Sequence, residues 1–179
     1  MRMRQAIDLR DLASRVTAIQ AGTEDACAIK SFLAGALYAL DRSAQCGFDP
    51  STATSAELDE NLRRMSQSDP PSEGVWLAGF YFNSALQRMA VVLERGLKVL
   101  TKRKGNVGVP ELFKIAEQMN FLNKRDYLDL DAVREEVNRL KHDVPGLIGK
   151  RKILTDGALA AAHQAVTLLE LVDSATRVV

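Results

Sequence analysis

Apolar residues recur at helical spacing along nearly the whole chain, and no segment alternates apolar and polar residues as a half-buried β-strand does. The clearest example is a set in which steps of three and four residues alternate: Leu130, Val133, Val137, Leu140 and Val144. Such spacing places the whole set on one side of a helix and favours close packing against a second helix. Asp129 or Asp131 is expected to cap this helix at its start. The sequence therefore predicts an all-α protein.

The same periodicity, together with glycine and proline breaks, predicts helices at about residues 5–21, 24–45, 75–101, 110–119, 129–144 and 155–175. Residues 24–45 are apolar on nearly every side, so we expect this helix in the middle of the bundle. In the longest helix, the residues expected to face the core are Phe82, Leu86, Met89, Leu93, Leu97 and Leu100. The expected fold is a single up-and-down helical bundle of roughly five to seven helices.

Residues 48–74 form a looser excursion from this bundle. Thr54 and Glu57 fit a capping box, in which a hydroxyl and a carboxylate accept hydrogen bonds from each other's backbone N–H groups at a helix start. Residues 66–74 contain two adjacent prolines and are predicted to be a loop.

Composition adds a few limits. With 179 residues the chain suits one domain, residues 1–179, and its net charge of +1 gives no global field toward nucleic acid or membranes. The longest apolar-rich stretch, residues 75–92, is interrupted by polar side chains and is not expected to span a membrane. No apolar secretion signal precedes the first helix, and Cys27 and Cys46 lie too far apart on one helix to pair. We therefore expect a cytoplasmic protein, with Cys27 in the core.

The common catalytic and cofactor signatures are absent from the sequence, including the phosphate loop, the dinucleotide fingerprint, His-Glu-x-x-His and Cys-x-x-Cys. We therefore expect no cofactor and no metal site. The sequence has two histidines. His163 is predicted to be an ordinary surface residue on the last helix, whereas the neighbours of His142 suggest chemistry.

His142 follows Arg134 and Asn138 at four-residue steps, so helical geometry places the three side chains along one polar stripe. A histidine near a helix C-terminus is favoured in its charged form and can exchange a proton near neutral pH. This arrangement suits RNA cleavage, with His142 as base or acid, Arg134 stabilising charge on the phosphate and Asn138 orienting the substrate. The alternative interpretation is a solvated helix face that ends in a histidine cap.

Residues 138–142 (Asn-Arg-Leu-Lys-His), near the end of the penultimate helix, resemble the signature segment of HEPN-domain proteins. Residues 81–88 and 93–98 of the long helix are also similar to HEPN helices, and the similarity covers roughly residues 75–175. The resemblance implies a small helical bundle that forms a homodimer through the face bearing the motif. It also implies a function with RNA, as a cleaving toxin or as the partner of a minimal nucleotidyltransferase.

One departure from the family pattern bears on catalysis. The family's catalytic motif has an arginine directly before the polar residue, and Val137 occupies that position here. Asn138 and His142 match the other two positions. Arg134 and Arg139 are the available replacements, and both point elsewhere around the helix. The resemblance therefore implies the fold more strongly than ribonuclease activity, in a degenerate member of the family.

Two basic clusters each adjoin a glycine: Lys102, Arg103 and Lys104, and then Lys150, Arg151 and Lys152. Beside His142 they would form a surface that follows the phosphates of a nucleic acid. The alternative is that they complement helix dipoles and keep loops soluble. No aromatic residue is interleaved with them, which argues against base stacking on single strands.

Three functions are therefore open. The first is a HEPN-like protein associated with RNA or nucleotides, in a defence or toxin–antitoxin system with an antitoxin or nucleotidyltransferase partner, and with weak or no catalysis. The second is an active metal-independent endoribonuclease that uses His142. The third is a non-catalytic protein-interaction or dimerisation module.

Overall fold

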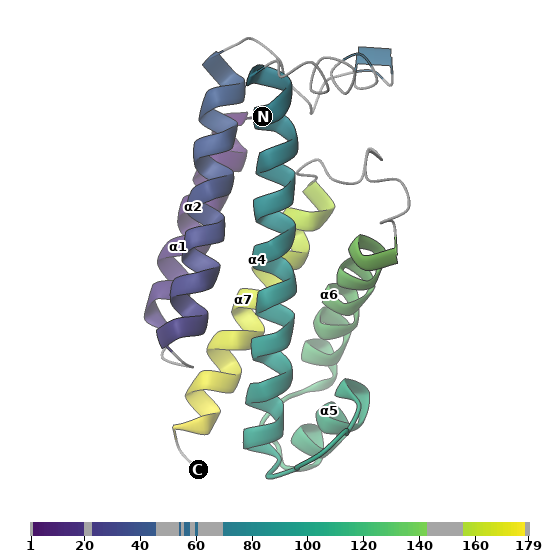
Figure 1. Cartoon of the computed structure of the whole chain (residues 1–179). Coiled ribbons are helices and arrows are strands. Elements are labelled where there is room, and N and C mark those ends of the chain that lie inside the picture. The colour runs from purple at the N-terminus through teal and green to yellow at the C-terminus, as the bar shows by residue number, and fades with distance from the viewer. Residues whose placement is uncertain are drawn as a thin grey trace.

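The structure, a computed structural model, describes residues 2–19, 23–45, 54, 56–57, 60, 70–142 and 156–177. Within these ranges there is no strand, and the helices in Figure 1 are α1 (Arg2–Ala18), α2 (Thr23–Gln45), α4 (Pro70–Leu100), α5 (Val109–Gln118), α6 (Lys124–His142) and α7 (Asp156–Thr176). The all-α helical bundle that the sequence predicts is confirmed.

The central helix is α4, which packs against α2, α5, α6 and α7. Behind α2 and α4 in Figure 1 lie α1 and α7, which also contact each other. Each α4 residue that was predicted to face the core is at most 2% exposed: Phe82, Leu86, Met89, Leu93, Leu97 and Leu100. The helical spacing of these residues therefore predicts correctly which side of α4 is covered.

The prediction that residues 24–45 lie in the middle of the bundle is wrong. Because α2 packs mainly against α4 and α1, one of its sides faces solvent. Tyr38 on that side is 65% exposed, and Cys27, which we expected in the core, is exposed as well. A helix between two neighbours buries only part of its circumference, so apolar residues on every side of α2 do not make it central.

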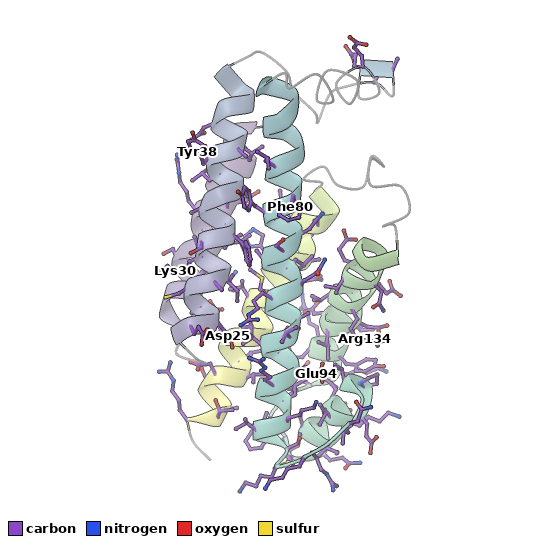
Figure 2. All side chains as sticks on the ribbon, viewed as in Figure 1. Asp25, Lys30, Tyr38, Phe80, Glu94 and Arg134 are labelled. Carbon is purple, nitrogen blue, oxygen red and sulfur yellow. The ribbon has the colours of Figure 1, made fainter. Side chains whose placement is uncertain are left out.

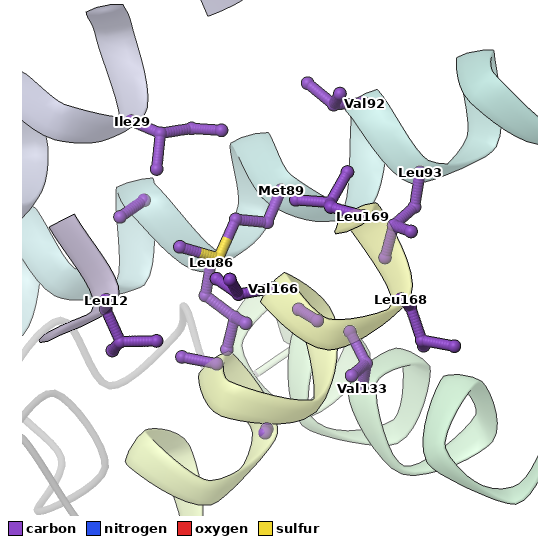
Figure 3. Packing of buried hydrophobic residues seen from close by; sticks show 14 of the residues in the cluster. Leu12, Ile29, Leu86, Met89, Val92, Leu93, Val133, Val166, Leu168 and Leu169 are labelled. Atoms are coloured by element: carbon purple, nitrogen blue, oxygen red, sulfur yellow. The ribbon is translucent and has the colours of Figure 1, made fainter. Parts of the chain in front are cut away.

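The buried apolar side chains form one continuous cluster to which α1, α2, α4, α5, α6 and α7 all contribute. Figure 3 shows its middle, where the packed side chains include Leu12, Ile29, Leu86, Met89, Val133 and Val166. Full burial of an aliphatic or aromatic side chain contributes about 1.5–3 kcal/mol. This cluster is therefore the main source of stability in the described part of the chain.

Helix α6 begins at Lys124, so it extends further toward the N-terminus than predicted. The Oδ1 atom of Asn123 accepts hydrogen bonds from the N–H groups of Arg125 (2.8 Å) and Asp126 (3.3 Å). In return, Oδ2 of Asp126 accepts the N–H of Asn123 at 2.7 Å. These reciprocal bonds satisfy N–H groups that have no partner within the helix. Asn123 is therefore the cap, and the predicted caps Asp129 and Asp131 lie inside α6.

Helix α4 begins at Pro70, so the predicted loop at residues 66–74 is wrong from residue 70 onward, and residues 66–69 lie outside the described ranges. Proline is compatible with a first helical turn because its missing N–H would have had no acceptor there. The two prolines therefore start the helix instead of preventing it.

The predicted capping box at Thr54 and Glu57 is confirmed. Oε2 of Glu57 accepts the Thr54 N–H at 2.6 Å, and Oγ1 of Thr54 accepts the Glu57 N–H at 3.3 Å. These contacts from the Thr54 backbone and hydroxyl hold the pKa of Glu57 below its usual value. A helix start thus forms within residues 48–74.

Two glycines allow α4 to approach its neighbours closely. A Cβ atom on Gly96 of α4 would lie only 2.5 Å from Cγ1 of Val172 on α7. A Cβ on Gly35 of α2 would lie 3.0 Å from the ring of Tyr81 on α4. A Cβ at Gly96 would displace the Val172 side chain, and a Cβ at Gly35 would force a small shift of the Tyr81 ring, so both glycines permit close interhelical contacts.

We expect Gly96→Ala to lower the free energy of unfolding by about 1 kcal/mol. Overpacking a buried contact costs ~1–3 kcal/mol, which outweighs the ~1 kcal/mol by which alanine is the better helix former. In a Val172→Ala background the clash is gone, so the same substitution should be neutral or stabilising, and the two changes should couple by ~1–2 kcal/mol. Urea denaturation of the four proteins measures this coupling, and additive effects would contradict the close approach.

Candidate functional site

An open groove of about 250 Å³ runs between α4 and α6, next to the start of α5. Figure 2 labels Glu94 of α4 and Arg134 of α6, which line it from opposite sides. The groove exists because α6 packs more extensively against α7 than against α4. The groove combines appreciable volume with polar side chains, and it contains residues singled out from the sequence.

The floor of the groove is apolar. Val133 and Val137 of α6 are 1% and 5% exposed, and Leu93 of α4 is 2% exposed. The predicted burial of Leu130, Val133 and Val137 is confirmed, whereas the side chain of Leu140 lies outside the described residues. Because these residues are three or four positions apart, they lie on one side of α6, and this side faces α7 and the groove.

The rim of the groove is polar and nearly neutral. Arg134 Nη1 pairs with Asp131 Oδ1 at 2.8 Å, and Lys98 Nζ pairs with Glu94 Oε1 at 2.7 Å, each within its own helix. Two amides, Asn138 and Gln87, complete the rim. Amides offer both donors and acceptors, so this rim can recognise uncharged polar edges as well as one anionic and one cationic group.

Two of the three residues in the predicted catalytic stripe line the groove, and the side chain of the third is not described. Arg134 and Asn138 both line the groove, as the stripe requires. His142 is the last residue of α6, and its side chain lies outside the described residues. Helical geometry places it ~6 Å along the axis from Asn138. Its participation remains a prediction.

Val137 occupies the position where the HEPN motif has arginine, and its side chain lies on the groove floor. Position 137 therefore supplies no positive charge to the groove. Arg134, a candidate replacement, faces the groove with its guanidinium held by Asp131. The side chain of Arg139 lies outside the described residues.

The structure does not bring the first basic cluster close to the end of α6. Lys102, Arg103 and Lys104 are exposed and follow the C-terminus of α4. In Figure 1, α6 runs antiparallel to α4, so the start of α6 lies near the end of α4 where this cluster follows. His142 is at the other end of α6, about 27 Å along the helix axis from Lys124. The second cluster, Lys150, Arg151 and Lys152, lies outside the described residues.

Lys102 has a structural role that the sequence did not reveal. Its φ of 53° is left-handed, and the hydrogen bonds from Lys102 N to Val99 O and from Arg103 N to Lys98 O, both 3.1 Å, form a Schellman motif. Asn120, with a φ of 59°, ends α5 in the same way. Lys102 therefore terminates α4, which favours the helix-end interpretation for that residue.

Sequence reasoning missed the half of the groove that α4 supplies. Gln87, Val91 and Glu94 follow helical spacing on a side of α4 that is not among its predicted core positions, and all three line the groove. The usable signal was Val91, an apolar residue within this otherwise polar stripe, which is 42% exposed. The partner of this stripe could not be identified without the arrangement of the helices.

Polar contacts that bridge helices also escaped prediction. Asp25 of α2 is 9% exposed and pairs with two arginines of α4, Arg88 and Arg95. Arg15 of α1 pairs with Glu170 of α7 at 2.7 Å, an interaction that raises the pKa of Arg15. His163 was predicted to be a surface residue and is about one-third exposed, near Asp8 and Asp11 of α1.

No group of three or more His, Cys, Asp or Glu residues in the described ranges is placed to hold a metal ion. None of the described helices is both long enough and apolar enough to cross a bilayer. Comparison with protein-family models, curated proteins and solved structures gives no match for this chain. The HEPN resemblance therefore depends on the motif residues and the long helix alone.

We expect Val137→Asp to lower the free energy of unfolding by about 2–4 kcal/mol, because it places an unpaired carboxylate in an apolar floor. Asn138→Asp introduces the same group at the next position, which is exposed, and should change stability by at most ~0.5 kcal/mol. Chemical denaturation of both variants tests the register of α6. Equal effects would mean that Val137 is not packed.

Proposed function

We propose that this chain is a HEPN-like protein that binds RNA or a nucleotide in the α4–α6 groove and has weak or no catalytic activity. The observation that carries the proposal is the position of the groove. It lies on the side of α6 where Arg134 and Asn138 point, directly before His142. Asn138 of the motif and the nearby Arg134 thus line a groove whose polar and apolar side chains suit a nucleotide.

The chemistry of the groove suits a nucleotide. Its aliphatic floor can cover the face of a base, and the Asn138 and Gln87 amides can pair with base edges. The ion pair between Arg134 and Asp131 is about 40% exposed on both sides, and such pairs contribute only ~0–1 kcal/mol. A phosphate can therefore replace Asp131 at little cost. On the opposite rim, Glu94 can accept a hydrogen bond from a ribose hydroxyl.

The size of the groove favours a single nucleotide or one unstacked base. Its volume of about 250 Å³ is below the ~300–1,000 Å³ of pockets for drug-sized ligands. Sequence-specific RNA recognition usually targets single-stranded bases that can be splayed out. We therefore expect single-stranded RNA to bind better than a duplex.

Weak or absent catalysis follows from the charges around the groove. Cleavage builds extra negative charge on the phosphate, and loss of one preorganised donor typically lowers the rate ~10²–10³-fold. Val137 stands at the arginine position, and Arg134 is paired with Asp131. The cluster at Lys102, Arg103 and Lys104 lies beyond the other end of α6 and cannot supply the charge.

The proposal includes a cytoplasmic location, a homodimer, and an antitoxin or nucleotidyltransferase partner in a defence or toxin–antitoxin system. The exposed thiol of Cys27 suits a reducing compartment. The partners follow from the HEPN resemblance. The alternative of a protein-interaction module is favoured by a different observation, the large apolar side chains exposed on α2 and α4.

Binding can be measured by fluorescence anisotropy with labelled single-stranded RNA and by calorimetry with the four ribonucleoside monophosphates. We expect Asn138→Ala to weaken binding about tenfold, the effect of one lost hydrogen bond. Gln118→Ala removes an exposed amide at the end of α5, outside the groove, and should leave the affinity unchanged. No binding by the wild type at millimolar nucleotide, or equal affinities for both variants, would contradict the proposal.

Cleavage can be measured with purified protein and mixed RNA in the presence of a chelator. We expect no degradation above background. Because Val137 lines the groove, Val137→Arg should extend a guanidinium into it. If thermal melts show that the fold tolerates this variant, its cleavage rate should rise by up to the ~10²–10³-fold that one donor contributes. His142→Ala in the same background should remove the gain. Robust cleavage by the wild type that His142→Ala abolishes would show an active ribonuclease.

A further inference from the structure

Basic side chains gather at the end of the bundle where α4 ends and α6 begins. We define the basic end as residues 98–126, from the last turn of α4, through α5, to the first turn of α6. Figure 1 places this segment at a single end of the molecule. It has seven basic and three acidic residues, a net charge of +4, whereas the whole chain has a net charge of +1. The remaining residues therefore sum to −3, and the positive charge is concentrated at one end.

Six of these seven cations have no acidic partner among the described residues. The exception is Lys98, which pairs with Glu94 of the groove rim at 2.7 Å. Of the three acidic residues, Asp126 is engaged at the start of α6, where its carboxylate accepts the Asn123 N–H. The six unpaired cations are all exposed: Lys102, Arg103, Lys104, Lys114, Lys124 and Arg125. Their charge is therefore available to an anionic ligand.

Buried packing holds the basic end together as one body. Three separate segments supply its cations, at the end of α4, on α5 and at the start of α6. Phe113 of α5 is 0% exposed, and its ring meets that of Tyr127 in α6 edge to face with centroids 5.0 Å apart. Leu100, at the end of α4, and Leu112 are fully buried in the same cluster. A ligand that spans the three segments therefore needs little ordering of the protein, a cost that flexible sites incur.

The basic end adjoins the α4–α6 groove. Val109, the first residue of α5, belongs to the basic end and also lines the groove. On α4, Glu94 of the rim precedes Lys102 by eight residues, or ~12 Å. On α6, Leu130 of the groove follows Arg125 by five residues, or ~8 Å. Successive phosphates of a stacked strand are ~3.4 Å apart, so a strand that leaves the groove reaches these cations within about four nucleotides.

A polynucleotide accounts for both features, whereas other anionic ligands account for one. Arg134 alone can hold the phosphate of a free nucleotide in the groove, which leaves the six cations of the basic end without a role. An anionic bilayer would attract the basic end, and the exposed Val99, Met119 and Leu128 can face its lipids, yet it offers no base for the groove. A nucleic-acid strand supplies both a base and a row of phosphates.

We propose that the ligand is a single RNA strand of several nucleotides, with one base in the α4–α6 groove and the adjoining phosphates along the basic end. This inference rests on the proposed function, because it decides between RNA and a free nucleotide at the same site. None of the exposed large apolar residues of the basic end is aromatic, so it contacts phosphates and only the groove holds a base. The cluster at residues 102–104 thus has a function apart from His142, from which the fold separates it.

Fluorescence anisotropy with labelled single-stranded RNAs of increasing length, beside calorimetry with the monophosphates, tests the basic end in the full chain. We expect an RNA of about six nucleotides to bind ~10²-fold more tightly than a monophosphate at low salt. Each phosphate contact with a single strand contributes ~0.7 to the slope of log affinity against log salt. Four contacts therefore predict a ~50-fold loss of affinity for this RNA between about 50 and 200 mM salt.

Two pairs of substitutions remove cations from different segments of the basic end. Arg103→Gln combined with Lys104→Gln removes two contacts and should reduce the loss over the same salt range to ~7-fold. Lys102 is kept because it terminates α4. Lys124→Gln combined with Arg125→Gln is an independent variant at the start of α6, with an expected change in the same direction.

The matched control is Arg10→Gln combined with Lys30→Gln, which changes the net charge by the same amount on α1 and α2. Figure 2 labels Lys30 on the side of the bundle away from α6. This control should retain the ~50-fold loss of the wild type. Because all three double variants keep the groove residues, their affinities for the monophosphates should equal that of the wild type. Thermal melts establish that the variants are folded.

An RNA that binds no more tightly than a monophosphate, or an equal change of slope in the control, would overturn the basic end as the phosphate site. Protein retained on phosphatidylserine vesicles, without any gain in affinity from RNA length, would assign it to a membrane instead. In these cases monophosphate binding still reports on the groove. Conversely, length-dependent RNA binding without monophosphate binding, and unaffected by Asn138→Ala, would refute the groove and support the basic end.

Discussion

The close packing of α4 against α7 and α2 positions the other helices. Gly96 lets α4 meet Val172 of α7 without an intervening side chain, and Gly35 lets the ring of Tyr81 lie on α2. With both neighbours fixed, α1 packs against α2 and α7, and α6 packs against α7. The groove is a consequence of this order, because α6 is positioned mainly by α7 and leaves part of α4 uncovered.

Polar contacts between helices specify the register that apolar packing leaves open. Asp25 links α2 to two arginines of α4, and Gln164 of α7 donates to Asp129 of α6 at 3.0 Å. Apolar helix faces can slide past each other by one turn at modest cost, whereas a largely buried carboxylate without its partner is strongly unfavourable. Such contacts therefore favour one alignment of the helices over its neighbours.

The sequence predicted the features that depend on local periodicity. The burial of Val133 and Val137, the covered side of α4 and the capping box at Thr54 all follow from spacing within one element. Features that depend on which helices become neighbours could not be predicted this way. The exposed side of α2 is an example, and so is the α4 wall of the groove. Spacing placed Asn138 correctly on its stripe, yet only the fold shows that Gln87 faces it across a hollow.

The start of helix α6 is held by contacts that do not involve α7. At its start, Asn123 caps the helix, and the ring of Tyr127 meets that of Phe113 in α5 with centroids 5.0 Å apart. From this start the 19 residues of α6 extend about 27 Å to His142. A rotation of ~10° about that point would displace the far end, which carries Asn138 and His142, by ~5 Å. The width of the groove at Asn138 therefore depends strongly on the angle at which α6 packs against α4 and α7.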